Sequence, residues 1–378
     1  MGFSSMDDFL NEVTVNGKFF RSDWNKLTHA TTAQVAGEWY CLFHGTGNPM
    51  AGLLTGGTNL SFQSLTDQTQ GAIPHGGIVT PDTKHILNAS AFSAAATSMP
   101  AIFMLVDLLG FYPMTSATTA NDQATIHAVT ATFANATDII THTGYDIASL
   151  TKVQFTNSGG ALPSGISALT DYWTIRQSAT TSKIATSLAL AIAGTAVDFT
   201  TDGTGTNTIT SFLPRYGTGA GVNCFVTPRT AAMGAATPNM RITYTDTGGN
   251  TGNLTPATLP VGKTASPIGH ICYSGTAAAG KYGPFMPLAA GDAGIKSIQQ
   301  LNLSISYAVA DGLAWCLCKP LLTLPMTTIG VAAERDLMNQ IPSLPQVYDG
   351  ACLAWLMYAG AATPVSSAFF GHLDFGWG

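Results

Sequence analysis

Charged side chains are scarce in this chain: Lys, Arg, Asp and Glu make up 10% of its 378 residues, whereas soluble domains average about 25%. Surface charge opposes association, so this scarcity implies a surface rich in uncharged polar residues, neighbours that cover much of it, or both. The formal net charge is −6, and Lys and Arg do not cluster among aromatic residues. Direct nucleic-acid binding is therefore not expected, because it normally leaves a basic patch.

Long apolar runs are also absent. The most apolar stretch, residues 89–112, is interrupted by Pro100 and Asp107, so no membrane-spanning helix is expected. The first ten residues carry Asp7 and Asp8 and lack a basic region followed by an apolar core, so a secretory signal is not expected either. These two carboxylates instead suit the N-terminus of a helix, where negative charge is favourable.

Patterns that carry enzyme or metal chemistry are missing as well. The glycine-rich stretches at 45–49 and 217–221 lack the Lys-Ser/Thr of a phosphate loop, which leaves them as turns. The eight histidines include no His-x-x-x-His pair, and there is no Gly-x-Ser-x-Gly elbow. Asp198, Asp202 and Gly203 match only part of a calcium loop, so a hairpin turn is expected there. We predict no catalytic residue, cofactor or metal ion, while a triad assembled by the fold stays open.

The six cysteines, at positions 41, 224, 272, 316, 318 and 352, do not have the spacing of a zinc site. Cys316 and Cys318 lie on one face of a predicted strand. Free Cys is among the most frequently buried residue types, so we predict six buried free thiols.

Turn-forming residues are abundant, with 40 Gly and 19 Pro, and they separate short apolar runs as in an all-β fold. These runs predict strands at 37–43, 101–112, 221–227, 241–246, 298–308, 313–319 and 351–358. Asp311-Gly312 predicts a hairpin between 298–308 and 313–319. Short helices are expected at 83–98 and 332–339. Asp107 lies within a buried strand and needs a partner, since an unpaired buried carboxylate is costly.

Residues 128–212 carry the clearest short-strand pattern and contain no Cys. Gly, Pro, Asn and Asp separate its alternating runs, which predicts a small antiparallel β module inserted into a host domain. Residues 1–127 plus 213–378 then form a discontinuous β-sandwich or jelly-roll-like host with few short helices. Tyr172 and Trp173 alternate across the strand, so one is expected in the core, and a sugar platform that includes Tyr145 is a lesser alternative.

The module resembles a β domain that recurs in virion proteins of tailed bacteriophages. The matching residues are Asp138, Gly144-Tyr145-Asp146, 153–156, 162–165, 171–175, 183–187, 194–198 and 203–206. The resemblance covers about a fifth of the chain and implies a small domain displayed on a head or tail component. The remainder looks like part of the same virion repertoire. It lacks the long spine helix of the usual major capsid protein and the repeats of an elongated tail spike.

From this resemblance we expect a non-enzymatic virion structural protein, a head decoration (cement) protein that binds the capsid lattice. Its partners would be the major capsid protein and sister copies, as a homo-oligomer such as a trimer by analogy. It would be made in the bacterial cytoplasm and end on the head exterior, without contact to nucleic acid or membrane. Low charge suits permanent interfaces, whose centres are depleted of charged residues.

Two alternatives remain open. The protein could be a tail or adsorption-apparatus component whose module touches the host envelope. It could instead be a glycan-binding or glycan-degrading protein that recognises a receptor.

Aromatic residues near both ends of the chain predict assembly contacts. The N-terminal arm, with an Asn16-Gly17 turn between extended segments, either lies across a neighbouring subunit or packs on its own domain. The C-terminal tail is too apolar to remain in solvent, so it either completes a sheet or docks on a neighbour. The predicted contact residues are Phe19, Phe20, Trp24, Phe369, Phe370, Phe375 and Trp377.

Overall fold

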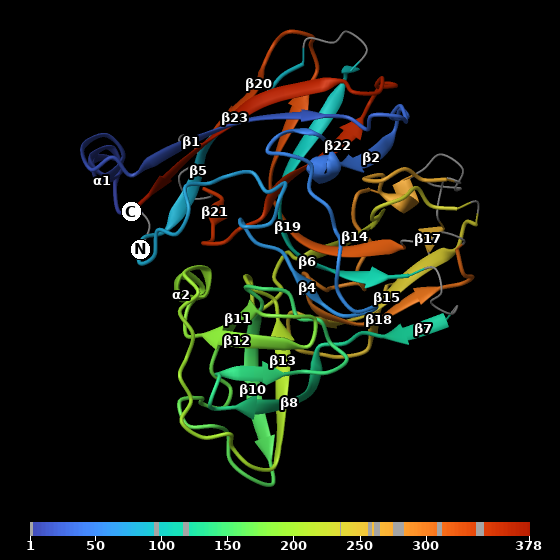
Figure 1. Ribbon diagram of the computed structural model, residues 1–378. Helices are drawn as coiled ribbons and strands as arrows, with labels where there is room; N and C mark the ends of the chain where they lie inside the picture. The colour runs from blue at the N-terminus through green and yellow to red at the C-terminus, as the bar shows by residue number, and fades with distance from the viewer. Residues whose placement is uncertain are drawn as a thin grey trace.

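A computed structural model describes residues 3–93, 98–115, 121–234, 236–255, 259–260, 265–274, 283–307, 312–337 and 344–378. In this part, antiparallel strands dominate and the helices are short, as the sequence predicts (Figure 1). The strands form three sheets in the host, residues 1–127 and 213–378, and one closed barrel within 128–212.

The terminal sheet contains the first and last long strands of the chain. Its order is β20 (Ala333–Asp336), β5 (Lys84–Ala91), β23 (Ala368–Trp377), β1 (Phe19–Leu27) and β3 (Gly47–Asn48), with β21 (Gln346–Val347) also on β5. The central sheet has the order β14 (Asn223–Pro228), β19 (Leu313–Met326), β6 (Ala101–Met114), β22 (Leu353–Ala359) and β2 (Glu38–Cys41), with β4 (Gln63–Ser64) on β6. The outer sheet has the order β16 (Asn253–Leu254), β15 (Asn239–Asp246), β18 (Ile295–Leu303) and β7 (Asn121–Ala124), with β17 (Leu259–Pro260) on β15.

The central sheet is buried on both faces. In β22, Trp355 and Met357 point into the core shared with the terminal sheet, whereas Ala354 and Leu356 point into the core shared with the outer sheet. We call these the terminal core and the outer core. A strand between two cores has no solvent face, which is why the sequence of β6, β19 and β22 is continuously apolar rather than alternating.

Asp107 finds the partner that the sequence predicts. It lies in β6 with no exposed surface, and Arg215 donates to both carboxylate oxygens at 2.8 and 2.7 Å. The same guanidinium donates to the carbonyls of Leu65 and Leu108, and the Cys352 N–H donates to Asp107 at 3.0 Å. A buried pair satisfied on all sides is held firmly, because removing one partner would leave an uncompensated charge.

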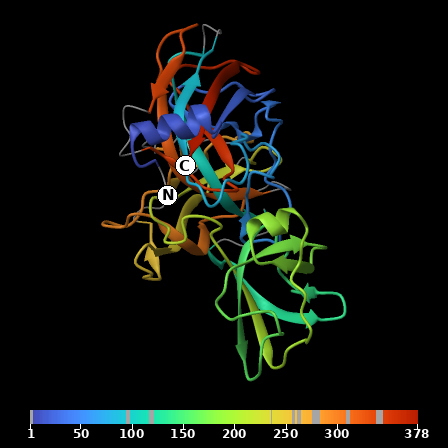
Figure 2. The same cartoon turned by 90° about the vertical axis from the view of Figure 1, so that its left-hand side faces the viewer.

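Residues 128–212, the range assigned to the inserted module, form a closed barrel. Its strands follow the order β10 (Lys152–Ser158), β11 (Tyr172–Arg176), β12 (Thr181–Ala185), β9 (Ile139–Thr141), β8 (Ala128–Ala134) and β13 (Thr206–Phe212), and β13 pairs again with β10. The barrel has its own core, which includes Phe133, Phe155 and Ile209. It projects from one end of the host in two perpendicular views (Figures 1 and 2).

Polar contacts fix the barrel to the host. The buried Tyr145 hydroxyl lies 2.8 Å from the carbonyl oxygen of Phe62 and 2.7 Å from Ser211 Oγ. The Asp146 N–H donates to Thr58 Oγ1 at 2.9 Å, and Gln63 Nε2 donates to the Asp146 carbonyl at 2.8 Å. Because the bonds to Thr58, Phe62 and Gln63 all engage the host segment 58–63, the barrel is held at a defined seam.

The helices are single turns. α1 (Met6–Leu10) begins after Ser5, whose hydroxyl accepts the Asp8 N–H at 3.0 Å, and its first turn carries the predicted acidic pair. A π-helical turn, η1 (Asn11–Val15), follows and ends before Gly17, whose φ is +66°. The Asn16-Gly17 turn therefore joins a helix to a strand, not two extended segments. The remaining turns are η2 (Leu42–His44), α2 (Leu188–Ile192) and η4 (Cys272–Ser274).

Both predicted host helices are wrong. Residues 84–91 form β5, which pairs with β23 and β20, and residues 333–336 form β20 itself. Residues 94–97, 338 and 339 lie outside the described part of the chain. Helix propensity in such short segments is weak, so pairing with strands distant in sequence prevails.

The predicted hairpin is also wrong. β18 pairs with β15 and β7 in the outer sheet, whereas β19 pairs with β14 and β6 in the central sheet. Residues 308–311, which include Asp311, lie outside the described residues. The two strands differ in environment: β18 keeps a partly exposed face, but residues 313–318 of β19 are buried on both faces and need partners on both sides.

Candidate functional site

Three of the predicted assembly residues belong to the core of their own chain. Trp24 is 3% exposed, and Phe369 and Phe375 have no exposed surface. All three pack in the terminal core, because β23 lies between β1 and β5 and completes the terminal sheet. A side chain without surface cannot meet a partner, so the predicted contact role of these three residues is corrected to a core role.

The other four predicted residues keep some surface. Phe19 is 40% exposed, while Phe20, Phe370 and Trp377 are half-buried. Phe370 packs against Phe92 on the outward side of the terminal sheet, with ring centroids 5.3 Å apart. The Trp377 ring lies 5.9 Å from the Lys84 ammonium. These residues are available for contacts, although none is a large protruding anchor.

The N-terminal arm presents an apolar surface that sequence reasoning missed. Phe9 is buried and packs edge-on against Phe3. The Phe3 ring in turn lies 6.0 Å from that of His85 in β5, which ties the arm to its own domain. Four apolar side chains of the arm are exposed, and we call Met6, Leu10, Val15 and Phe19, at 43, 47, 74 and 40% exposure, the arm surface. The spacing of Met6 and Leu10, four residues apart, was the available signal, since such residues share one helical face.

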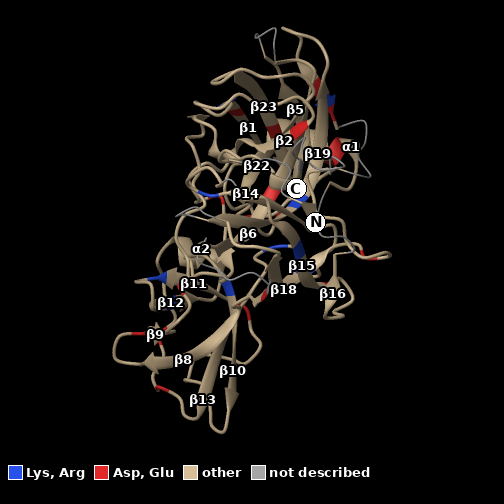
Figure 3. Cartoon of the chain, turned by 90° about the vertical axis from the view of Figure 1, so that its right-hand side faces the viewer, with Lys and Arg blue, Asp and Glu red and all other residues tan. Residues whose placement is uncertain are grey.

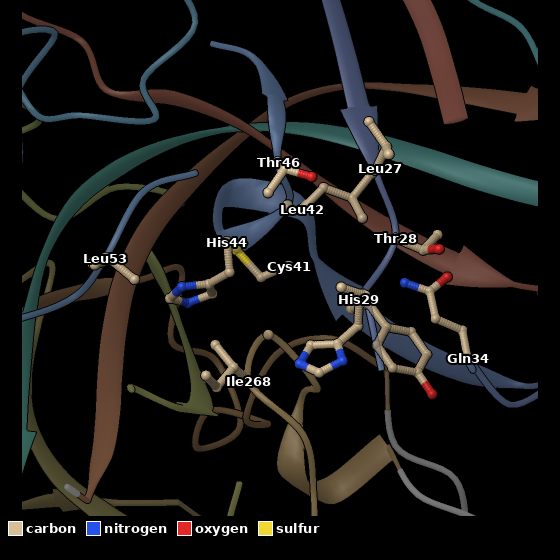
Figure 4. A pocket seen from close by; sticks show the side chains of 14 residues that line it. Leu27, Thr28, His29, Gln34, Cys41, Leu42, His44, Thr46, Leu53 and Ile268 are labelled. Atoms are coloured by element: carbon tan, nitrogen blue, oxygen red, sulfur yellow. The ribbon is translucent and has the colours of Figure 1, made fainter. Parts of the chain in front are cut away.

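A pocket lies where the end of β1 meets β2, η2 and the segment 268–269 (Figure 4). Its volume is about 160 Å³, and its walls are mainly apolar, with Leu27, Leu42, Leu53 and Ile268 among them. No Lys, Arg, Asp or Glu lines it. The polar lining includes His29, Gln34 and His44, which stand on different sides of the space.

The Nε2 atoms of the two histidines differ in hydrogen-bonding role: that of His29 is a donor, and that of His44 is an acceptor. His29 Nδ1 accepts the N–H groups of Thr31 and Thr32 at 3.3 and 3.1 Å, so in the neutral ring the proton lies on Nε2. His44 Nδ1 lies 3.1 Å from the Gly52 carbonyl, which can only accept, so Nδ1 carries the proton and Nε2 keeps its lone pair. Burial lowers the pKa of His29 and lowers the pKa of His44 to about 4, which keeps both rings neutral.

Two buried acceptors of the pocket lack a partner. Gln34 is held by reciprocal backbone hydrogen bonds with Thr363 at 2.9 and 3.0 Å and is 2% exposed. Neither its Oε1 nor Nε2 of His44 has a hydrogen-bond partner in the described part of the chain. An unsatisfied buried polar atom is expensive. Both atoms are buried beside the pocket and are not open to a molecule within it.

A buried Ser-His-Glu arrangement lies behind the pocket. His270 Nδ1 lies 3.1 Å from Ser266 Oγ, its Nε2 lies 3.2 Å from Glu38 Oε2, and the Tyr40 hydroxyl donates to that carboxylate at 2.7 Å. Ser266, His270 and Glu38 have no exposed surface and do not line the pocket. A substrate has no route to this serine, so we interpret the network as support for the adjacent segment 268–269.

The burial of the other candidate residues from the sequence shows whether each of them can meet a ligand. The six cysteines are buried free thiols, as predicted, and burial raises the pKa of Cys41 to about 12. Tyr145 and Tyr172 are buried in the barrel, so they cannot form a sugar platform with Trp173. Asp202 accepts the Asn135 N–H at 2.6 Å in a turn.

Within the described residues, no group of three or more His, Cys, Asp or Glu could hold a metal ion. None of the helices described here is long and apolar enough to cross a membrane. Charged residues are thinly spread along the ribbon of host and barrel alike (Figure 3).

A scan against protein-family models finds no match for the chain, and a search of curated proteins finds no significant relative.

Proposed function

We propose that the chain is a non-enzymatic virion structural protein of a tailed bacteriophage, a decoration protein that binds the capsid lattice and displays the barrel. One observation carries the proposal: a self-contained closed barrel projects from a three-sheet host, and its sequence resembles a module displayed on such particles. The polar seam at residues 58–63 holds the barrel at a defined angle, as display requires.

The low charge of the chain supports a role in assembly. With charged residues at 10%, large uncharged areas of surface are available for permanent contacts. The arm surface is the strongest candidate for contact with the lattice, because it groups four exposed apolar side chains within residues 6–19.

Binding to particles tests the proposal. The full chain is mixed with capsids that lack it, and bound copies are counted on sedimented particles. We expect hundreds of copies per particle, and a lattice of barrels visible by electron microscopy. A few copies confined to the tail or to one vertex would favour the adsorption-apparatus alternative, and no binding at all would contradict both.

Paired variants locate the contact. Leu10→Ser with Val15→Ser replaces two exposed apolar side chains of the arm surface, so binding to capsids should fall at least tenfold without loss of folding. Leu169→Ser in the barrel is the matched control, since Leu169 is 69% exposed and belongs to the barrel, not to the arm. Equal loss in both would exclude the arm surface as the specific contact.

A further inference from the structure

We propose that a groove between the host and the barrel binds a pyranose unit that carries a carboxylate, as in an acidic glycan. The groove lies where residues 214–220 and the barrel residue Lys152 meet β19 and the segment 345–348. The inference does not rest on the proposed assembly role, because it uses none of the residues of the arm surface.

Two adjoining hollows make up the groove. They share Tyr216, Lys319 and Tyr348, and their volumes are about 520 and 240 Å³. A protein cavity of about 150 Å³ accepts one six-membered ring, so the larger hollow alone has room for a sugar unit. Gly217, Thr218 and Tyr348 are exposed, so the groove is open to solvent and a glycan can enter it from outside.

The groove carries one positive charge that has no counter-charge in the described part of the chain. Its charged lining residues are Lys152, Arg215 and Lys319, and no described Asp or Glu lines it. Arg215 is neutralised by the buried Asp107, and Lys152 Nζ lies 3.3 Å from the Asp171 carboxylate. Lys319 has no carboxylate partner among the described residues, and burial alone lowers the pKa of its ammonium. The excess charge of the groove therefore lies on Lys319.

The backbone makes room for the Lys319 ammonium. Lys319 Nζ donates to the Ala220 carbonyl at 2.8 Å and lies 5.7 Å from the centre of the Tyr216 ring. Gly221 has a φ of +69°, which favours glycine, and a Cβ at this position would collide with the Lys319 nitrogen. An ammonium has three N–H donors, so the bond to Ala220 leaves donors for a ligand. Because this ammonium has lost part of its hydration without gaining a counter-charge, an incoming anion stabilises it.

A second ammonium borders the same loop from the barrel side. Lys152 Nζ would lie 4.0 Å from a Cβ on Gly217, which is exposed, so this nitrogen stands at the edge of the open groove. The exposed Thr218 adds a hydroxyl next to Gly217. Ammonium groups form strong, charge-assisted hydrogen bonds to carboxylates, and a hydroxyl can serve a sugar hydroxyl as donor or acceptor. The polar groups of the groove therefore match a carboxylate and its neighbouring hydroxyl.

Tyr348 supplies an aromatic surface for the sugar ring. It is 38% exposed, and its ring packs edge-on against that of Tyr216, with centroids 4.8 Å apart. The Tyr216 hydroxyl is buried, so Tyr216 supports the Tyr348 ring and offers no polar group to the ligand. An acidic peptide would use the ammonium groups alone, whereas a pyranose would also pack its C–H face on the exposed ring. The combination of ring and ammonium groups thus favours an acidic sugar.

Titration of the full chain with methyl glucuronoside and methyl galacturonoside tests the proposal. Saturable binding of at least one uronoside is expected, with a dissociation constant on the order of 1 mM for a single ring. Binding should weaken in about 1 M salt, which screens charges beyond about 3 Å. Methyl glucoside is the uncharged control and acetate the control without a ring, and both should bind at least tenfold more weakly.

Three outcomes would overturn the proposal. Acetate that binds as tightly as the uronosides would leave an adventitious ion only. Tighter binding of a polyglutamate peptide would identify the groove as a site for an acidic protein segment. Absence of binding of either uronoside to the folded chain would show that the excess charge of the groove does not serve an acidic sugar.

Variants locate the bound sugar. Lys319→Gln removes the charge but keeps an amide that can donate to Ala220, so uronoside affinity should fall at least tenfold, because hydrogen bonds to charged groups are the stronger ones. Tyr348→Leu removes the ring and should weaken uronoside binding about threefold or more. Lys183→Gln removes a partly exposed lysine of the barrel outside the groove and should bind like the parent chain.

Lys152→Gln gives an independent measurement if Lys319→Gln fails to fold, and it should also weaken uronoside binding. Undiminished binding by the folded lysine variants of the groove and by Tyr348→Leu would place the sugar elsewhere. Capsid binding should stay unchanged in all of them, which keeps this test separate from that of the proposed function.

Discussion

The host and the barrel differ in how completely their buried polar atoms are hydrogen-bonded. In the barrel, His142 lies between the Tyr145 carbonyl and Ser182 Oγ at 2.8 and 3.1 Å, and no buried side-chain atom within residues 128–212, all of them described, lacks a partner. The host buries Asp107 with Arg215 and leaves atoms such as Gln34 Oε1 without a partner. Satisfied networks favour rigidity, whereas each unsatisfied buried polar atom costs free energy. The barrel is therefore expected to be the more rigid of the two regions.

The largest expected loss of stability comes from breaking the buried ion pair in the host, which we compare with a partly exposed pair in the barrel. Arg215→Met should lower the free energy of unfolding of the host by about 3 to 5 kcal/mol, because Asp107 would remain buried and unpaired. Arg176→Met breaks the partly exposed pair with Asp146 in the barrel and should cost at most about 1 kcal/mol. Hydrogen exchange read by mass spectrometry reports each region separately. Similar losses in the two variants would remove this difference between the regions.

As the pH falls, the host should lose stability at a higher pH than the barrel does. Burial lowers the pKa of His44 to about 4 and of His75 to about 3, whereas unfolded histidine titrates near pH 6.5. Below that value the unfolded chain takes up protons that the folded host does not, so stability falls as the pH falls. The two residues together should remove about 4 kcal/mol between about pH 8 and pH 5.

Equilibrium unfolding at the two pH values checks this prediction. The double variant His44→Gln with His75→Gln should show a flatter pH dependence than the parent chain. The barrel contains one such residue, His142, whose pKa burial also lowers, so its exchange rates should change less than those of the host. A barrel that opens first on acidification would reverse the comparison.

A smaller effect is expected at the seam that joins the two regions. Tyr145→Phe removes the hydrogen bonds to Phe62 and Ser211, which should cost about 1 to 2 kcal/mol because a buried acceptor is left unpaired. Exchange protection should be lost at residues 58–63 and not in the terminal sheet. Tyr172→Phe, inside the barrel, is the control and should leave residues 58–63 protected. Loss of protection throughout the host would show that the seam supports more than the barrel's position.

The smallest effect compares two helix caps. Ser187 accepts the Leu190 N–H at the start of α2 in the barrel, and Ser5 accepts the Asp8 N–H at the start of α1. Ser187→Ala should lower barrel stability by about 1 kcal/mol, since a lost N-cap costs about that much. Ser5→Ala should only fray the arm and leave the main unfolding transition unchanged. A change in host melting temperature in Ser5→Ala would show that α1 is part of the cooperative unit.

The sequence predicts the parts of this fold that depend on local pattern. The alternation within 128–212 marks the range of the barrel, and the continuous apolar runs of β6 and β22 mark strands buried on both faces. It does not predict β5, whose Ala-rich sequence becomes a strand only because β23, from the other end of the chain, pairs with it. The sequence also does not predict that β18 and β19 belong to separate sheets, because their partner strands too are distant along the chain.

The sequence does not predict the pocket, and here the reason is different. Its polar residues flank one predicted strand, yet nothing in their spacing shows that the Nδ1 atoms of His29 and His44 would be occupied by backbone groups. The hydrogen bonds from Thr31 and to Gly52 determine which nitrogen of each ring carries the proton, and those arise from loop conformation. Burial of Trp24 and Phe369 likewise follows from the sheet order, which local sequence does not encode.

The barrel leaves the host and returns to it through paired strands, because Ala128 in β8 lies opposite Thr210 in β13. Its two points of attachment are therefore neighbours in space, and the host needs only to bridge a short gap if the segment between them is exchanged. At the level of the gene, a single contiguous cassette can be replaced by another without altering the residues of the terminal or outer core. The barrel can thus diversify by recombination while the three sheets that carry it stay the same.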